Sequence, residues 1–232
     1  MKNKRYRNIG ERGAIILLMV VVLSAVFYVG CGNRQAEQAS SSEGEMAYVG
    51  KEGRPYREVD VPTPNKGEGK NTVEGVVLHH TAEDSVEKAL SILTNPEKGV
   101  SCHVLIDKDG TRYVLASPET VTWHAGKSWF NGKENANNTT IGVEFQGNTL
   151  EEPLTDDQIR SAIEYLRPIM EKYDIPSERI VTHEQIRQEW KRRHPKSNVP
   201  DKRDITPDEY SRFMNALNDS IANGSWNDTH KK

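Results

Sequence analysis

Three strand-like runs decide the fold of this chain: VVLHHTA (residues 76–82), SCHVLID (residues 101–107) and IGVEFQG (residues 141–147). Each is mostly apolar, yet together they carry His79, His80, His103 and Glu144. A buried charge costs several kcal/mol unless it is paired or bound to a metal. A fourth apolar run, RIVTHE, ends on His183. Ionisable side chains at the ends of strands indicate a metal site or an acid–base site.

The pattern between these runs predicts one α/β domain with a central mixed β-sheet flanked by helices. Asp109-Gly110 lies between two strand-like runs, which predicts a hairpin over residues 101–117. Thr155 is a predicted helix N-cap, and Pro168 inside the same helix predicts a kink or a break. The other expected elements are helices over 83–95 and 207–222, a loop over 123–138, and a polar insertion after His183.

Side-chain alternation separates the two faces of the strand IGVEFQ. Ile141, Val143 and Phe145 are expected in the core, whereas Gly142, Glu144 and Gln146 would face a narrow polar cleft. The alternative for Glu144 is a buried ion pair with a lysine or arginine. His79 and His80 are neighbours on a strand and must point to opposite faces, and periodicity does not say which of them enters a site. Two histidines and a carboxylate would suit Zn²⁺.

Composition narrows the range of possible functions. The chain has 232 residues and a formal net charge of −3. Residues 1–30 carry a net +4, so the remainder is acidic, at −7. An acidic remainder without a concentrated Lys/Arg stripe argues against nucleic acid as a partner. The nearest basic cluster, EWKRRH (residues 189–194), is interpreted as a solvated helix face.

The N-terminus has the organisation of a targeting segment. A basic stretch precedes an apolar run from Ala14 to Gly30, and Cys31 follows at once. This resembles a bacterial lipoprotein signal whose cysteine is lipidated, although Tyr28 stands where that pattern prefers leucine. The alternative is an uncleaved membrane anchor, because 17 apolar residues are close to the minimum for spanning. Both place the rest of the chain in the cell envelope, outside the cytoplasmic membrane.

Four regions are therefore expected. Residues 1–31 form the signal or lipid-anchor segment, and the polar residues 32–66 form a flexible tether. Residues 67–222 form the catalytic domain, and residues 223–232 a disordered tail. With Cys31 lipidated, Cys102 would have no partner for an intrachain disulfide.

Several segments, in this order, resemble the zinc-dependent N-acetylmuramoyl-L-alanine amidases, relatives of phage-type amidase lysozymes and peptidoglycan recognition proteins. They are VVLHHTA, SCHVLIDKDGTRYVL, TWHAGKSWFNGKENANNTTIGVEFQG, VTHE and KRD. The resemblance covers about Val73 to Asp204 and is most specific in the WHAG and IGVE block. It implies a peptidoglycan-recognition-protein-like fold.

The resemblance also implies residue roles. His79, His183 and Asp204 would bind Zn²⁺, Glu144 would be the catalytic acid–base residue, and Lys202 would face the substrate. His103, Trp123 and His124 would line the cleft. The family usually places its K-x-D element about ten residues after the histidine, whereas 21 positions separate His183 from Asp204. Asp201 therefore competes as the third ligand, and His194 inside the insertion is a less favoured substitute.

The implied activity is hydrolysis of the amide between N-acetylmuramic acid and L-alanine in peptidoglycan or muropeptides. The main alternative is a non-catalytic peptidoglycan-binding module of the same fold, which the loss of a ligand position would favour. A further alternative is a metallohydrolase acting on another amide.

Overall fold

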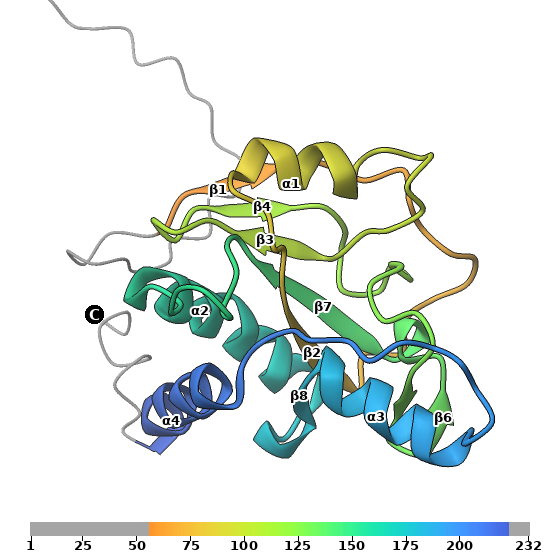
Figure 1. Ribbon diagram of the computed structural model, residues 1–232. Coiled ribbons are helices and arrows are strands. Elements are labelled where there is room, and N and C mark those ends of the chain that lie inside the picture. Colours follow the sequence, from red (N-terminus) through yellow and green to blue (C-terminus); the bar gives the residue numbers. More distant parts are fainter. Residues whose placement is uncertain (1–55, 223–232) are drawn as a thin grey trace, which may run out of the picture. The chain divides into compact units, whose positions relative to one another are not determined.

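The computed structural model describes residues 56–222, and their core is a six-stranded mixed sheet (Figure 1). The strand order is β1-β4-β3-β7-β2-β8, with only the β3–β4 pair antiparallel. The strands are β1 (Glu58–Asp60), β2 (Gly75–His80), β3 (Val104–Ile106), β4 (Arg112–Val114), β7 (Thr140–Phe145) and β8 (Ile180–Thr182). The expected α/β fold with a mixed sheet and flanking helices is confirmed.

Helices cover both faces of this sheet (Figure 1). The apolar faces of α2 (Asp156–Tyr173) and α4 (Pro207–Ala222) pack on one face, where Leu78, Val143 and Phe145 join Leu166 and Phe213 in the main core. On the other face, α1 (Val86–Leu93) packs on Leu105, and α3 (His183–Arg193) places Ile186 against Val77. Adjacent residues of β2, such as Val77 and Leu78, thus pack against helices on opposite faces of the sheet.

Several local predictions are confirmed. The hairpin of β3 and β4 turns at Asp109-Gly110, where Gly110 has a φ of 85°. Thr155 caps α2 through a capping box, and the apolar residues of that helix are buried in the main core. Ile141, Val143 and Phe145 are likewise core residues, as strand alternation predicts. The segment 189–194 is helical except for its last residue, with Trp190 buried and the charged side chains directed outward.

The compact domain begins before residue 67, within the segment that the sequence predicts to be a flexible tether. Residues 58–60 form the edge strand β1, which pairs in parallel with β4. Tyr56 is buried, and Asn65 is held by the carbonyls of Leu93, Asn95 and Val100. The sequence signal is weak because β1 is only three residues long and exposes Glu58 and Asp60. The compact domain therefore includes residues 56–66.

Two further expectations need correction. The loop over 123–138 contains a small hairpin, β5 (Trp129–Phe130) and β6 (Lys133–Glu134), followed by the 3₁₀ turn η1 (Ala136–Asn138). Its turn is Asn131-Gly132, both with positive φ, a common two-residue hairpin turn. Helix α2 also continues through Pro168, so the break is not found, and Leu166 and Met170 on either side of the proline are buried in the main core.

A second 3₁₀ turn, η2 (Ser177–Arg179), leads into β8. Within residues 56–222 no helix is both long and apolar enough to span a bilayer. The expected anchor at residues 1–31, the tether up to residue 55 and the tail after residue 222 lie outside the described residues.

Candidate metal centre and its cavity

Strand register places the first two candidate residues side by side. β2 and β7 are parallel neighbours in which His79 is paired with Glu144 and Leu78 with Val143. Since Leu78 and Val143 both enter the main core, His79 and Glu144 both point to the opposite face. His80 points the other way, where the backbone N–H of Thr149 donates to its Nδ1 at 3.1 Å. His79, and not His80, therefore belongs to the site.

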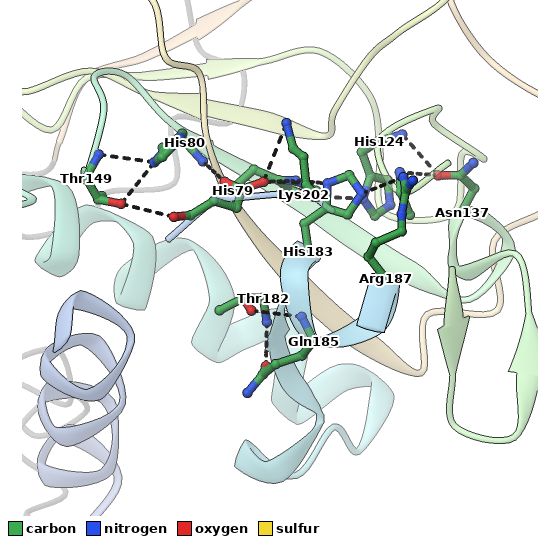
Figure 2. Close-up of polar contacts among 12 residues, drawn as sticks. His79, His80, His124, Asn137, Thr149, Thr182, His183, Gln185, Arg187 and Lys202 are labelled. Atoms are coloured by element: carbon green, nitrogen blue, oxygen red, sulfur yellow. Dashed lines mark hydrogen bonds and ion pairs between the residues drawn. The ribbon is translucent and has the colours of Figure 1, made fainter. Parts of the chain in front are cut away.

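The other two residues, His183 and Asp204, come from the C-terminal part of the domain, and Figure 2 shows His183 beside His79. β8 pairs with β2 up to Thr182, and a capping box between Thr182 and Gln185 starts α3 at His183. This puts His183 at the same edge of the sheet as His79. Asp204 lies between α3 and α4, and its Oδ1 accepts the backbone N–H of His80 at 2.5 Å. That bond turns the other oxygen, Oδ2, toward the two imidazoles.

The three side chains form a tight cluster. His79 Nδ1 lies 3.1 Å from His183 Nδ1, and Asp204 Oδ2 lies 3.4 Å from the former and 3.5 Å from the latter. Zinc bonds of about 2.0–2.2 Å in a tetrahedron separate neighbouring ligand atoms by roughly 3.3–3.6 Å. No hydrogen bond of ordinary geometry reaches buried Oδ2 from the described residues. Spacing, donor types and this orphaned oxygen all fit a metal ion.

The protonation states also suit metal binding, which needs neutral imidazoles and an ionised carboxylate. Burial lowers the pKa of His183 to about 4. Although burial raises the pKa of Asp204, its contacts with His183 and His79 hold that pKa well below the usual range. At neutral pH His183 is therefore neutral and Asp204 ionised, as metal binding requires.

Glu144 has the character of a poised proton acceptor. Burial raises its pKa to about 7, the Asp204 carboxylate adds to this rise, and His79 and Lys202 oppose it. Its Oε2 is buried without a hydrogen-bond partner among residues 56–222, and the residue lines the cavity. No basic side chain forms an ion pair with it within that range. The ion-pair alternative for Glu144 is therefore not what the structure shows.

The residues around Asp204 distinguish the competing ligands. Lys202 Nζ lies 3.9 Å from Asp204 Oδ2 and lines the cavity. Asp201 is instead exposed and pairs with Lys191. His194 stacks on Trp190, with ring centroids 4.2 Å apart, outside the cluster. Geometry thus favours Asp204 over both alternatives.

A cavity of about 410 Å³ opens beside the cluster. Trp123, 38% exposed, stands on its wall, and His124 also lines it. The polar side is complemented by an apolar side made of Ala89, Ile92, Leu93 and Val100. His103 is fully buried and does not line the cavity. Its Nδ1 accepts the backbone N–H of Gly142 at 2.9 Å, so it supports β7 from behind the wall.

Three residues that contact the site histidines or their backbone were not predicted from the sequence. Asn137 Oδ1 accepts the backbone N–H groups of His124 and Ala125 at 3.0 and 2.7 Å. The Thr140 hydroxyl lies 3.4 Å from His124 Nε2. Arg187, one helical turn after His183, places Nη2 3.4 Å from His183 Nε2. The i to i+4 spacing could have revealed Arg187, whereas the contacts of Asn137 and Thr140 depend on loop geometry.

Residues 69–197, more than half of the chain, match the profile of the family described as N-acetylmuramoyl-L-alanine amidase. The match contains His79, Glu144 and His183 but ends before Asp204. A 1,6-anhydro-N-acetylmuramyl-L-alanine amidase, AmpD of Haemophilus influenzae, is 37% identical over 51% of this chain and 59% of its own. The N-acetylmuramoyl-L-alanine amidase AmiD of Escherichia coli is 30% identical over 49% and 46%. The chain thus spans about half the length of these relatives.

Solved structures share the fold. An N-acetylmuramoyl-L-alanine amidase, LysC of Clostridium intestinale, aligns over 70% of this chain and 97% of its own, with a TM-score of 0.51 and 24% identity. A selenomethionine AmpD derivative aligns over 69% and 94%, with a TM-score of 0.53 and 20% identity. From the extent of the profile match, the chain belongs to the N-acetylmuramoyl-L-alanine amidase family.

Proposed function

We propose that this protein is a zinc-dependent amidase that hydrolyses the bond between the lactyl carbonyl of N-acetylmuramic acid and L-alanine in peptidoglycan or muropeptides. The observation that carries the proposal is the convergence of His79 Nδ1, His183 Nδ1 and Asp204 Oδ2 within 3.5 Å of one another. Glu144 is the next residue across the sheet from His79, at the wall of the same cavity.

His79, His183 and Asp204 would hold the ion. Zinc bound in such a site supplies Lewis-acid chemistry toward a carbonyl and toward water. Two neutral imidazoles and one carboxylate leave a divalent ion with a formal charge of +1, so this ligand set preserves that property.

Glu144 is the group that moves the proton. Its carboxylate accepts a proton from the attacking water, as the oxygen of that water bonds to the lactyl carbonyl carbon. The same carboxyl then gives the proton to the alanine nitrogen, as the carbon–nitrogen bond breaks. A pKa near 7 suits both directions of transfer at neutral pH. The products are the muramic acid carboxylate and a peptide with a free amino terminus.

Lys202 is proposed to stabilise charge on the reacting carbonyl. Its side chain is 44% exposed at the cavity, and its ammonium nitrogen lies 3.9 Å from the buried carboxylate of Asp204. A cation placed where an oxyanion develops stabilises the transition state more than the ground state.

The names of the relatives support the choice of substrate. Both are amidases of N-acetylmuramoyl-L-alanine bonds, and one is named for 1,6-anhydro substrates. A binding module without catalysis is less well supported, because all three candidate ligands and a glutamate with a buried, unpaired Oε2 are present.

The test is hydrolysis by the purified full chain loaded with zinc. Intact and 1,6-anhydro muropeptides would be incubated with it and the products identified by mass spectrometry. We expect a free peptide that begins with L-alanine. Binding of muropeptide with no cleavage would instead establish the binding module, and cleavage at another amide would establish a different hydrolase.

Metal analysis of two aspartate variants tests the ligand set. Asp204→Ala should lose bound zinc, whereas Asp201→Ala should retain one ion per chain, because Asp201 is exposed and faces Lys191. Zinc, iron and manganese would be measured together by elemental analysis. Retention of zinc by Asp204→Ala would refute the assignment.

We further propose that the chain is a membrane-anchored lipoprotein of the cell envelope. The support is the basic stretch, apolar run and Cys31 at its N-terminus. Expression of Cys31→Ser beside the parent chain, with labelled fatty acid, tests this. The label should be lost in the variant; an unlabelled parent chain that stays in the membrane fraction would favour an uncleaved anchor.

A further inference from the structure

His124 connects the candidate ligand His79 to the backbone of the following loop. His79 Nε2 lies 3.1 Å from His124 Nδ1, and His124 Nε2 lies 3.4 Å from the hydroxyl of Thr140. The Thr140 hydroxyl lies 2.7 Å from the carbonyl oxygen of Ala136. His124 and Thr140 are both buried, at 8% and 0% exposure, so water does not compete readily for these contacts.

The last group in this series of contacts, the carbonyl of Ala136, determines the direction of each hydrogen bond in the series. The Ala136 carbonyl can only accept, so the Thr140 hydroxyl donates to it and receives the N–H of His124 Nε2. In that tautomer, His124 Nδ1 carries a lone pair and accepts the N–H of His79 Nε2. The remaining nitrogen of His79, Nδ1, then presents its lone pair to His183 and Asp204, as a metal ligand must.

The position of the His124 ring is also built into the fold. A Cβ at position 142 would lie 2.5 Å from Cγ of His124, so the ring can occupy this place only because β7 has glycine there. Asn137 fixes the backbone on the other side by accepting the N–H groups of His124 and Ala125 (Figure 2).

The second histidine of the cluster has no such partner. The remote nitrogen of His183, Nε2, faces Arg187 Nη2 at 3.4 Å. Arginine is only a donor, so it cannot accept a proton from that nitrogen. A hydrogen bond from Arg187 would leave the proton of neutral His183 on Nδ1, so among the described residues only His79 has a neighbour that favours a lone pair on the nitrogen facing the cluster.

We propose that His124 is a positioning residue, which accepts the Nε2 proton of His79 and so directs the Nδ1 lone pair of His79 into the metal cluster. This inference rests on the proposed function only in that the cluster binds a metal ion. Partners of this kind change metal affinity by about 10–100-fold when they are removed.

Two substitutions of similar size separate this role from simple packing. In His124→Asn, the side-chain oxygen takes the place of Nδ1 and still accepts a hydrogen bond. In His124→Leu the volume is kept and the acceptor is lost. Zinc affinity of the full chain would be measured by competition with a chromophoric chelator. We expect the Leu variant to bind about 10–100-fold more weakly than the parent, and the Asn variant to stay within about threefold.

The tautomer itself is a second readout. Nitrogen-15 NMR of the metal-free full chain should show His79 protonated at Nε2 in the parent and a mixture of tautomers in His124→Leu. Should that variant fail to fold, Thr140→Val, which removes only the hydroxyl, should produce a partial mixture. Equal zinc affinity in the parent and the Leu variant, or equal weakening by Leu and Asn, would overturn the proposal. If the parent bound no zinc, the proposed function would fail, and the tautomer measurement would still decide the role of His124.

Discussion

Two glutamates are held in low-polarity surroundings in this domain, and they serve different purposes. Glu164 on α2 is fully buried, and its Oε2 faces Arg112 Nη1 at 3.5 Å. Glu144 on β7 has no basic partner among the described residues and borders the cavity beside His79. Burial raises both pKa values, to about 8 for Glu164 and about 7 for Glu144. A perturbed carboxyl therefore identifies a site only together with a cavity and nearby ligands.

The largest expected effect is on the catalytic rate, which should depend on Glu144 and not on Glu164. Glu144→Gln should lower kcat by about 10²–10⁴-fold, because an amide cannot accept and return the proton. Glu164→Gln should leave kcat per folded molecule within about twofold. Muropeptide cleavage by the full chain and zinc content of each variant are the measurements. A Glu144→Gln variant with normal turnover would remove the distinction between the two residues.

The next prediction concerns stability, where substitution of Glu164 should have a larger effect than substitution of Glu144. Glu164→Ala should lower the free energy of unfolding by about 3 kcal/mol, because it leaves a cavity and takes a partner from the buried Arg112 guanidinium. Glu144→Ala, at a cavity wall, should cost less than about 1 kcal/mol. Urea unfolding of the metal-free variants at one pH measures both. Equal losses would show that the site glutamate also has a structural role.

A third prediction concerns how the stability contribution of Glu144 changes with pH. The folded pKa of Glu144, about 7, is above its ordinary value of 4.5, so the folded state holds the proton more tightly than the unfolded chain. Its contribution to stability is present below about pH 4.5 and is lost as the pH rises through 7. Metal-free Glu144→Gln should thus gain about 2–3 kcal/mol on the parent between pH 5 and 8. A constant difference across that range would contradict this assignment of the pKa.

The smallest effect is expected at a carboxylate that is neither buried nor beside a cavity. Asp201 is 75% exposed and pairs with Lys191, so its pKa is lowered by that ammonium group. Asp201→Asn should leave the midpoint of thermal unfolding nearly unchanged, because an exposed ion pair contributes little to stability in water. Thermal unfolding at low and high salt checks this value, with Asp204→Asn as the matched variant. A large loss at Asp201 would mean that the 194–204 segment depends on its pair with Lys191.

Much of this fold could be predicted because its signals are local. Alternation in residues 141–146 identified the core face of β7, and Thr155 with its capping box marked the start of α2. Edge strand β1 was missed because three residues with two exposed charges give no periodicity. The hairpin at Asn131-Gly132 was missed although its turn dipeptide is a recognised signal.

The site was only partly accessible from sequence. Residue types and family resemblance pointed to His79, Glu144, His183 and Asp204. Whether His79 or His80 enters the site depends on which face of β2 carries the cavity, and that is decided by packing over long sequence distances. The choice of Asp204 over Asp201 likewise rests on a hydrogen bond to the backbone of His80, 124 positions away.

The pairing of His79 with Glu144 has one more consequence. The distance between them is set by backbone hydrogen bonds between adjacent strands, which lie about 4.8 Å apart. It does not depend on the conformation of a loop. The segments around the cavity, such as the one that carries α3 between His183 and Asp204, can therefore vary in length while Glu144 keeps its place beside His79. A designer could exchange the rim segments of this domain to alter which molecules enter the cavity, and leave His79 and Glu144 in register.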